Sequence, residues 1–182
     1  MAEKRRLFID PNRLTDEIDS NGELILTFDE AHYLYRVMRM RSGDLLEVID
    51  GKGHIWDAKT LKKQTIKLTN YFDKPHQLVA REIPLICIAV VIPKKGFENI
   101  LQMSCEIGVD IIQPLISKRS VVKECNNEKI IRYKKIIHEA VEQSERLWSP
   151  NLMDALIFSN WINDLSSEAQ IGFATTRIHD LQ

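Results

Sequence analysis

A continuously apolar stretch, Leu85–Ile92, constrains the fold of this chain more than any other feature. It is rich in isoleucine and valine, the pattern of a central parallel strand that is buried on both faces. The residues after it alternate between helical and extended patterns, which predicts an α/β domain with a mainly parallel sheet over residues 76–182. The expected elements are a helix with Phe97, Leu101 and Cys105 on its inner face, a strand at 111–116, a helix from 128 to about 147 capped by Asn127, a helix at 159–165 capped by Ser159, and a strand at 171–174.

The residues before this stretch have a different pattern. Short apolar runs are separated by turn residues, and Asp50-Gly51-Lys52-Gly53 is a strong hairpin signal. One amphipathic helix is expected near 29–39. Many short strands with such turns are typical of a small barrel, so residues 1–75 are predicted to form an all-β domain. The expected strands lie at 7–9, 24–28, 45–49, 55–60 and 65–68.

Composition limits the class of protein. The 182 residues are 44% hydrophobic and 28% charged, with a net charge of −1, so only local patches could attract a nucleic acid. No apolar run could span a bilayer, and no signal core follows the basic N-terminus, which predicts a cytoplasmic location. The three cysteines, Cys87, Cys105 and Cys125, are odd in number and widely spaced, which favours ordinary buried thiols over disulfides or a metal site.

Positive side chains gather in the first part of the chain. They lie in Lys4-Arg5-Arg6 and at helical spacing in the 29–39 segment, and such a patch on a small barrel suits phosphate contacts. A solvated helix face beside a frayed terminus would give the same pattern. The candidate RNA-binding residues here are Arg5, Arg6, His32, Arg36, Arg39 and Arg41.

Two further groups lie in the second part. Lys94 and the pair Lys118-Arg119 follow two predicted strands, at the sheet edge where α/β ligand sites form, although ordinary loop charge would look the same. In the long helix, the face with Glu142, Gln143 and Arg146 contains an i, i+4 ion pair. Such a pair stabilises a helix by about 0.2–0.5 kcal/mol, which is the simpler explanation. No glycine-rich phosphate loop, nucleophile elbow or metal-binding histidine pair is present.

These segments together resemble one family. The run from Pro93 to Gln102, the run Cys105-Glu106-Ile107-Gly108-Val109 and the run from Gln113 to Val122 are similar to the central signature of the RsmE methyltransferases. The run from Glu139 to Arg146 resembles the next motif of that family. Arg5-Arg6-Leu7-Phe8-Ile9 and the run from His32 to Asp44 are similar to its N-terminal barrel, so the resemblance covers nearly the whole chain in the same order.

The resemblance implies a PUA-like RNA-binding barrel followed by a SPOUT-type domain with a trefoil knot. Enzymes of this family form homodimers and use S-adenosylmethionine to methylate N3 of a uridine in 16S ribosomal RNA. It implies that a cation, Arg119 or Arg146, stabilises the anionic base, and that Glu142 or Gln143 positions it. Lys94, Lys118 and the arginines of the barrel would contact RNA.

Two departures from the family pattern qualify these expectations. The Gly-Pro-Glu-Gly-Gly loop and the later segments that complete the knot and contact the cofactor do not occur in this sequence, so they are expected beyond Gln182. Met103 stands where a lysine is usual. The chain is therefore expected to be inactive by itself, for lack of a complete cofactor pocket. Two alternatives stay open: a non-catalytic RNA-binding module or fragment, and a SPOUT methyltransferase that acts on transfer RNA.

Overall fold

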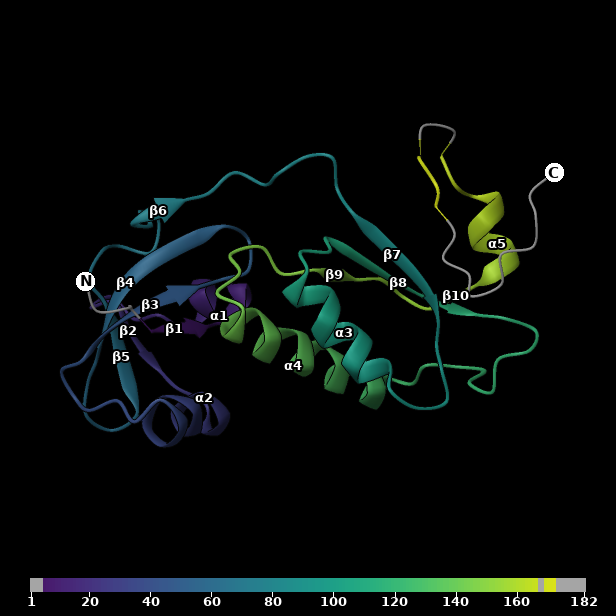
Figure 1. Ribbon diagram of the computed structural model, residues 1–182. Helices are drawn as coiled ribbons and strands as arrows, with labels where there is room; N and C mark the ends of the chain where they lie inside the picture. Colours follow the sequence, from purple (N-terminus) through teal and green to yellow (C-terminus); the bar gives the residue numbers. More distant parts are fainter. Residues whose placement is uncertain (1–4, 167–168, 173–182) are drawn as a thin grey trace.

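A computed structural model describes residues 5–166 and 169–172 of the chain. The molecule is elongated, with a β-rich part at one end and an α/β part at the other (Figure 1). One long helix, α4 (Asn127–Gln143), has its carboxyl end against the β-rich part. The fold class predicted from the sequence, an all-β part followed by a parallel α/β part, is confirmed.

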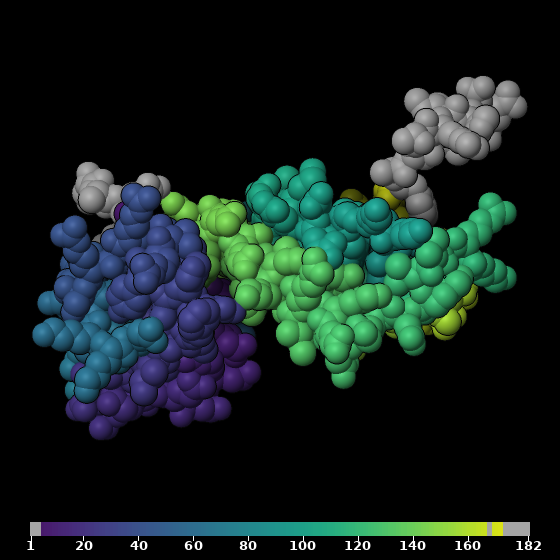
Figure 2. All heavy atoms as spheres, turned by 90° about the horizontal axis from the view of Figure 1, so that it is seen from below, coloured from purple at the N-terminus to yellow at the C-terminus, as the bar shows by residue number. Residues whose placement is uncertain are grey.

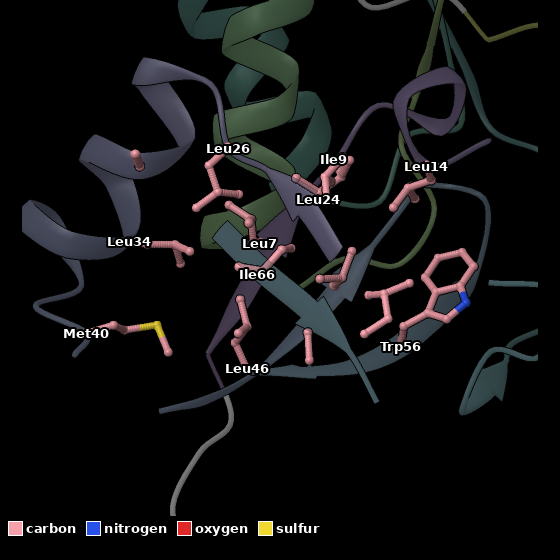
Figure 3. Close-up of a cluster of buried hydrophobic side chains, with 14 residues drawn as sticks. Leu7, Ile9, Leu14, Leu24, Leu26, Leu34, Met40, Leu46, Trp56 and Ile66 are labelled. Carbon is pink, nitrogen blue, oxygen red and sulfur yellow. The ribbon is translucent and has the colours of Figure 1, made fainter. Parts of the chain in front are cut away.

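The β-rich part is one curled sheet with strands in the order β1-β3-β4-β5-β2. Strand β1 runs parallel to β3, and the other neighbours are antiparallel. Alternate side chains of these strands fill a single apolar core, to which Leu7, Leu34 and Leu46 contribute (Figure 3). The strands are β1 (Arg6–Phe8), β2 (Glu23–Ile25), β3 (Leu45–Ile49), β4 (His54–Thr60), β5 (Thr65–Leu68) and β6 (Gln77–Leu78), which pairs with β4.

The helix predicted at 29–39 is shorter and changes its pitch. Helix α2 (Phe28–His32) begins at a capping box formed by Thr27 and Glu30 and continues as a π-helical turn, η1 (Tyr33–Val37). Arg39 lies beyond this turn with a φ of 55°. The predicted α-helical stripe of His32, Arg36 and Arg39 was therefore wrong as a single face, because π-helical turns displace the side chains that follow. A short helix, α1 (Pro11–Asp16), was not predicted, although Asp10 caps it and proline opens it.

The second sheet is parallel throughout, with β8 (Ile111–Ile116) at its centre. Strand β7 (Cys87–Val91) pairs with one side of β8, and β9 (Asn151–Leu152) and β10 (Leu156–Ile157) pair with the other. Among the described residues β7 has a neighbouring strand on one side only, so its predicted central position stays a prediction. Cys87 and Val91 are accordingly exposed, so the cysteine prediction fails at Cys87, whereas Cys105 is buried.

Helix α3 (Phe97–Glu106) and helix α4 lie on the same side of this sheet (Figure 1). Asn126, rather than the predicted Asn127, caps α4. Helix α5 (Phe158–Asn163) starts one residue before the predicted cap Ser159, which makes no capping bond there. Of the strand predicted at 171–174, residues 171 and 172 are not extended strand, and 173–174 lie outside the described residues. No described helix has the length and apolar character that crossing a membrane requires.

The two parts share a core. Phe8, Ile49 and Ile55 come from strands of the first sheet, yet they pack with the buried side chains of α3, α4 and β8. The β3–β4 turn also forms hydrogen bonds with the segment that follows α4. Gly53 N donates to Leu147 O (2.9 Å), and Ser149 N donates to Gly51 O (2.8 Å). Contacts of this kind make the junction a packed interface. The domain boundary near residue 75 stays a prediction.

Candidate functional site

The residues predicted to act on RNA fall at two separate places in the structure. Lys94, Lys118 and Arg119 lie at the carboxyl ends of β7 and β8. Of the other predicted residues, Arg36, Arg39 and Arg41 lie on η1 and in the segment after it. The rest lie where the barrel meets the carboxyl end of α4. Arg146 contacts the turn that precedes β8, and Arg119 follows the end of β8, so the length of this strand, about 20 Å, separates them.

The first place is a cationic sheet edge. Strands β7 and β8 are parallel and in register from Cys87 with Ile111 to Val91 with Leu115, so the loops after them emerge side by side. Lys94, Lys118 and Arg119 are all exposed there. Ser120 holds the second loop, because its hydroxyl donates to Ser117 O (2.9 Å) and Val122 O (2.8 Å). The predicted convergence of these cations at one sheet edge is present.

The second place begins at the free edge of β1. Phe8 N donates to the carboxyl of Glu142 across 2.8 Å, so a helix side chain takes the position of a missing neighbouring strand. Arg6 donates to Glu145 O and also pairs with Glu47 at 3.0 Å. Arg6 therefore joins the two parts of the chain. Its predicted phosphate contact would have to compete with these partners.

Glu142 occupies an unusual environment for a carboxyl group. Its pKa is raised to about 8, chiefly by burial, with smaller contributions from the nearby Glu139 and Glu30, while the hydrogen bond from Phe8 N acts to lower it. Beside it, the imidazole of His138 stacks on the Phe8 ring with a centroid distance of 4.1 Å. Burial lowers the pKa of His138. Both groups are therefore mainly neutral at pH 7.

This pKa predicts a pH dependence of stability. Below about pH 4.5 the carboxyl is protonated in both the folded and the unfolded chain, and its full contribution to the free energy of unfolding is present. Between about 4.5 and 8 only the unfolded chain releases the proton, so the free energy of unfolding should fall as the pH rises. Urea titrations at several pH values measure this. The Glu142→Gln variant cannot ionise and should show a flatter profile, and identical profiles would contradict the assignment.

The guanidinium of Arg146 is bound by backbone carbonyl groups. Its guanidinium donates to Cys105 O (3.3 Å), Gly108 O (2.9 Å) and Val109 O (2.6 Å), and it lies 3.4 Å from the Asp110 carboxylate. These contacts tie the end of α3 and the turn before β8 to the segment after α4. The predicted catalytic role of Arg146 stays a prediction, and the geometry gives it a structural role first.

The positive side chains around η1 are free. Arg36, Arg39 and Arg41 are exposed, and their guanidinium groups make no hydrogen bond or ion pair with the part of the chain that the structure describes. His32 is exposed beside the ring of Phe28. Arg5, also exposed, lies at the mouth of the neighbouring hollow. Unpaired cations of this kind are available for phosphate groups.

Two adjoining hollows lie between the barrel segment α2–η1 and α4. The first has a volume of about 590 Å³ and the second about 500 Å³, and Tyr33, Glu142 and Gln143 line both of them. Figure 2 shows the crease where the barrel meets α4. Sequence reasoning missed Tyr33, Phe8 and His138 as lining residues, because their pattern indicates only strand and helix positions. No cluster suited to a metal ion occurs among residues 5–166 and 169–172.

Comparison with known proteins matches both parts. Residues 81–181 match the family described as RNA methyltransferase domain, and residues 26–68 match the RNA methyltransferase PUA domain. The ribosomal RNA small subunit methyltransferase E of Synechocystis is 33% identical over 165 residues, which are 88% of this chain and 51% of that protein. The one from Bacillus subtilis is 32% identical over 85% of this chain and 61% of its own length.

Solved structures agree on the fold. A putative methyltransferase from Legionella pneumophila, solved with bound SAM, has a TM-score of 0.73 at 24% identity and covers 93% of this chain and 70% of its own. The fold and the domain matches define an RNA-modifying class of protein, in which a PUA-like barrel precedes a SPOUT-type α/β domain. The chain belongs to the RsmE family of RNA methyltransferases. It spans about half to two thirds of the length of the curated relatives that it matches.

Proposed function

We propose that this protein takes part in S-adenosylmethionine-dependent methylation of N3 of a uridine in 16S ribosomal RNA. Membership of the RsmE family supports the reaction, because relatives that match 85–88% of this chain are named ribosomal RNA small subunit methyltransferases. In this proposal the described residues chiefly bind and position the RNA. The observation that carries it is the set of exposed, unpaired arginines around η1, beside the hollows at the junction.

The cofactor of this reaction would be S-adenosylmethionine, and the described residues can be compared with its charge. The described residues at the carboxyl edge of the second sheet offer exposed cations, Lys94, Lys118 and Arg119, and these do not suit a positively charged sulfonium. The two hollows lie at the junction with the barrel, and none of these three cations lines them. The described residues thus do not form a fitting pocket for S-adenosylmethionine, and no step is assigned to one.

Roles for individual residues follow from their location, either at the cationic sheet edge or at the junction of the barrel with α4. Arg119 could stabilise negative charge on a base that approaches the carboxyl edge of the sheet. Glu142 and Gln143 belong to the junction in the same chain, so they would hold a different part of the RNA. Lys94 and Lys118 would contact phosphates near Arg119, and Arg5, Arg6, His32, Arg36, Arg39 and Arg41 would contact phosphates near the junction.

A homodimer and a cytoplasmic location belong to the same proposal. Met103 is 60% exposed and Ile107 73% exposed on and just after α3, and oligomers bury apolar surface of this kind. Ribosomal RNA as the substrate would place the protein with the ribosome. Sedimentation velocity tests the assembly, and a single species with the mass of one chain at all concentrations would remove the dimer from the proposal.

Methylation is best tested in cells that lack the gene. Methylation of N3 blocks the pairing edge of uridine, so reverse transcription on 16S ribosomal RNA should stop at one uridine in wild-type cells and read through in the deletion strain. Restoring the gene should restore the stop. Loss of N3-methyluridine from transfer RNA instead would support the transfer RNA alternative. Unchanged N3-methyluridine in both RNA classes would support a non-catalytic RNA-binding module.

RNA binding by the arginines around η1 gives a salt-dependent prediction. Each phosphate contact releases counterions, so Arg36→Gln should weaken binding of single-stranded 16S fragments similarly for all sequences and reduce the slope of log K against log salt by about 0.7–0.9. Fluorescence anisotropy at several salt concentrations measures the slope. Lys129→Gln is the control, because Lys129 is exposed at the other end of α4. Equal slopes for both variants would reject the contact.

A further inference from the structure

The hollow of about 590 Å³ runs between α2–η1 on one side and α4 on the other. This volume is in the range that small ligands occupy in proteins. It continues into the second hollow, so the two form one groove along the domain junction, which we call the junction groove. Residues from both parts of the chain line it, among them Phe8, Tyr33, Ile131, His138 and Glu142.

Polar and aromatic groups meet on the floor of the junction groove. The Glu142 carboxyl accepts from Phe8 N at 2.8 Å, and its second oxygen has no hydrogen bond within the described residues. The stacked rings of Phe8 and His138 line the same hollow, and Tyr33 lines both hollows. A flat ligand with hydrogen-bonding atoms on its edge would match this combination of ring faces and a carboxyl group.

Two acids of the groove walls are paired with cations. Asp29 pairs with Lys135 at 2.6 Å, and Glu30 pairs with Arg13. The other charged groups of the lining are the acids Asp10 and Glu139 and the cations Lys134 on α4 and Arg5 in the second hollow. The groove thus combines a floor of ring faces and one carboxyl group with exposed cations on α4 and in the second hollow. This distribution suits a nucleotide, whose base is neutral and whose phosphates are anionic.

We propose that the junction groove binds one unpaired nucleotide of the RNA, with the edge of its base on the Glu142 carboxyl and its phosphates on Arg5 and Lys134. The proposal deepens the proposed function and rests on it. An unpaired nucleotide is required, because in a duplex the pairing edge of the base is occupied. A protonated carboxyl offers one donor and one acceptor side by side, which complements an edge with an adjacent acceptor and donor.

The state of Glu142 at neutral pH supports this geometry. Phe8 N from β1 bonds to it, and Glu30 from α2, Tyr33 from η1 and Glu139 from α4 interact with its charge. The other charged or titratable groups that line its hollows are Arg5, Arg6, Asp10, Asp29, His32, Lys134, Lys135, His138 and Glu145. With a pKa of about 8, the carboxyl keeps its proton at pH 7 and can donate. As the pH rises through 8, it loses the donor and gains a negative charge close to the RNA, so affinity should fall.

The position of the groove gives the nucleotide its role. Arg119 and the other cations of the sheet edge line neither hollow, and the length of β8, about 20 Å, separates Arg119 from Arg146, which lies four residues after Glu142. One nucleotide could not reach both places. The nucleotide in the junction groove is therefore a recognition contact, separate from the base near Arg119, and it selects RNA with an unpaired position at a fixed distance from that base.

Photo-crosslinking tests the location directly. The 182-residue protein is mixed with single-stranded RNA that contains 4-thiouridine, irradiated and mapped by mass spectrometry. Crosslinks in peptides that contain Tyr33 or His138 are expected, and their yield should drop when the 4-thiouridine is base-paired. Crosslinks confined to the outer barrel or the sheet edge, with RNA bound, would overturn this proposal and leave the proposed function standing. RNA that does not bind at all would overturn both.

Two variants with matched controls test the chemistry. Ile131 is 69% exposed on the groove wall, so Ile131→Glu should reduce affinity for single-stranded RNA roughly five-fold through like-charge repulsion. Ile83→Glu, at a site that is 85% exposed outside the groove, should not. Glu142→Gln should remove the loss of affinity between pH 7 and 9, whereas Glu128→Gln, at the far end of α4, should keep it. Equal effects within either pair would overturn the proposal.

Discussion

The Gly53→Ala variant is expected to lose about 3 kcal/mol of unfolding free energy, an unusually large effect for adding one methyl group. A Cβ atom at Gly53 would lie 2.4 Å from Val79 O and 2.9 Å from the ring of Trp148. Both neighbours are held in place, because Val79 N donates to Gly53 O and Trp148 Nε1 donates to Val79 O. The β3–β4 turn could not keep its position between the two parts of the chain.

Gly96 provides a matched control for this prediction. Its φ of +84° is close to the +87° of Gly53, but a Cβ atom there meets nothing within 4 Å. Gly96→Ala should therefore show only the cost of the left-handed backbone, about 1 kcal/mol. Urea unfolding of the two variants gives the comparison. Equal losses would mean that the turn does not need its close fit against Val79 and Trp148.

The second large effect is expected for Arg146→Met, which should destabilise the fold by about 3–5 kcal/mol. The variant keeps the apolar length of the side chain but leaves the carbonyls of Cys105, Gly108 and Val109 without their donor. Asp110 would keep its contact with Arg81 at 3.4 Å and lose the one with Arg146. Asp110 is only 8% exposed, so a weakened ion pair there is costly.

Arg132→Met is the control for this effect. Arg132 pairs with Glu98 at 3.4 Å, but its side chain is 70% exposed, so its removal should cost less than about 1 kcal/mol. Chemical denaturation followed by circular dichroism measures both variants. If Arg146→Met were as stable as Arg132→Met, the structural role assigned to Arg146 would be wrong, and its predicted catalytic role would gain weight.

Sequence patterns predicted the strands best where turn chemistry and alternation agreed. Strands β3 and β5 have their predicted bounds, because glycine, lysine and aspartate turns delimit them. The apolar run before residue 93 predicted a strand correctly, and its central place in the sheet stays a prediction, because the described residues supply a neighbour on one side only. Among these residues Val91 is exposed, which an apolar pattern alone does not indicate.

The sequence predicted individual residues of the candidate site better than it predicted how these residues are arranged in space. Lys94 and Arg119 were expected at one sheet edge because parallel strands place their carboxyl ends together, and the structure has them there. The junction groove depends on how Phe8 meets Glu142, a contact across 134 positions that no local pattern contains. The π-helical turn at Tyr33–Val37 could not be predicted either, because the apolar residues in this segment keep an α-helical spacing.

The central claim is that the face formed by η1 and the junction groove binds RNA, and an equilibrium titration tests it most directly. Labelled single-stranded fragments of 16S ribosomal RNA are titrated with the 182-residue protein at several salt concentrations. Saturable binding is predicted, with log K falling linearly as log salt rises, and it should weaken when Arg36, Arg39 and Arg41 are together replaced by glutamine. Binding that is absent at low salt, or that is unchanged by this triple replacement, would contradict the account.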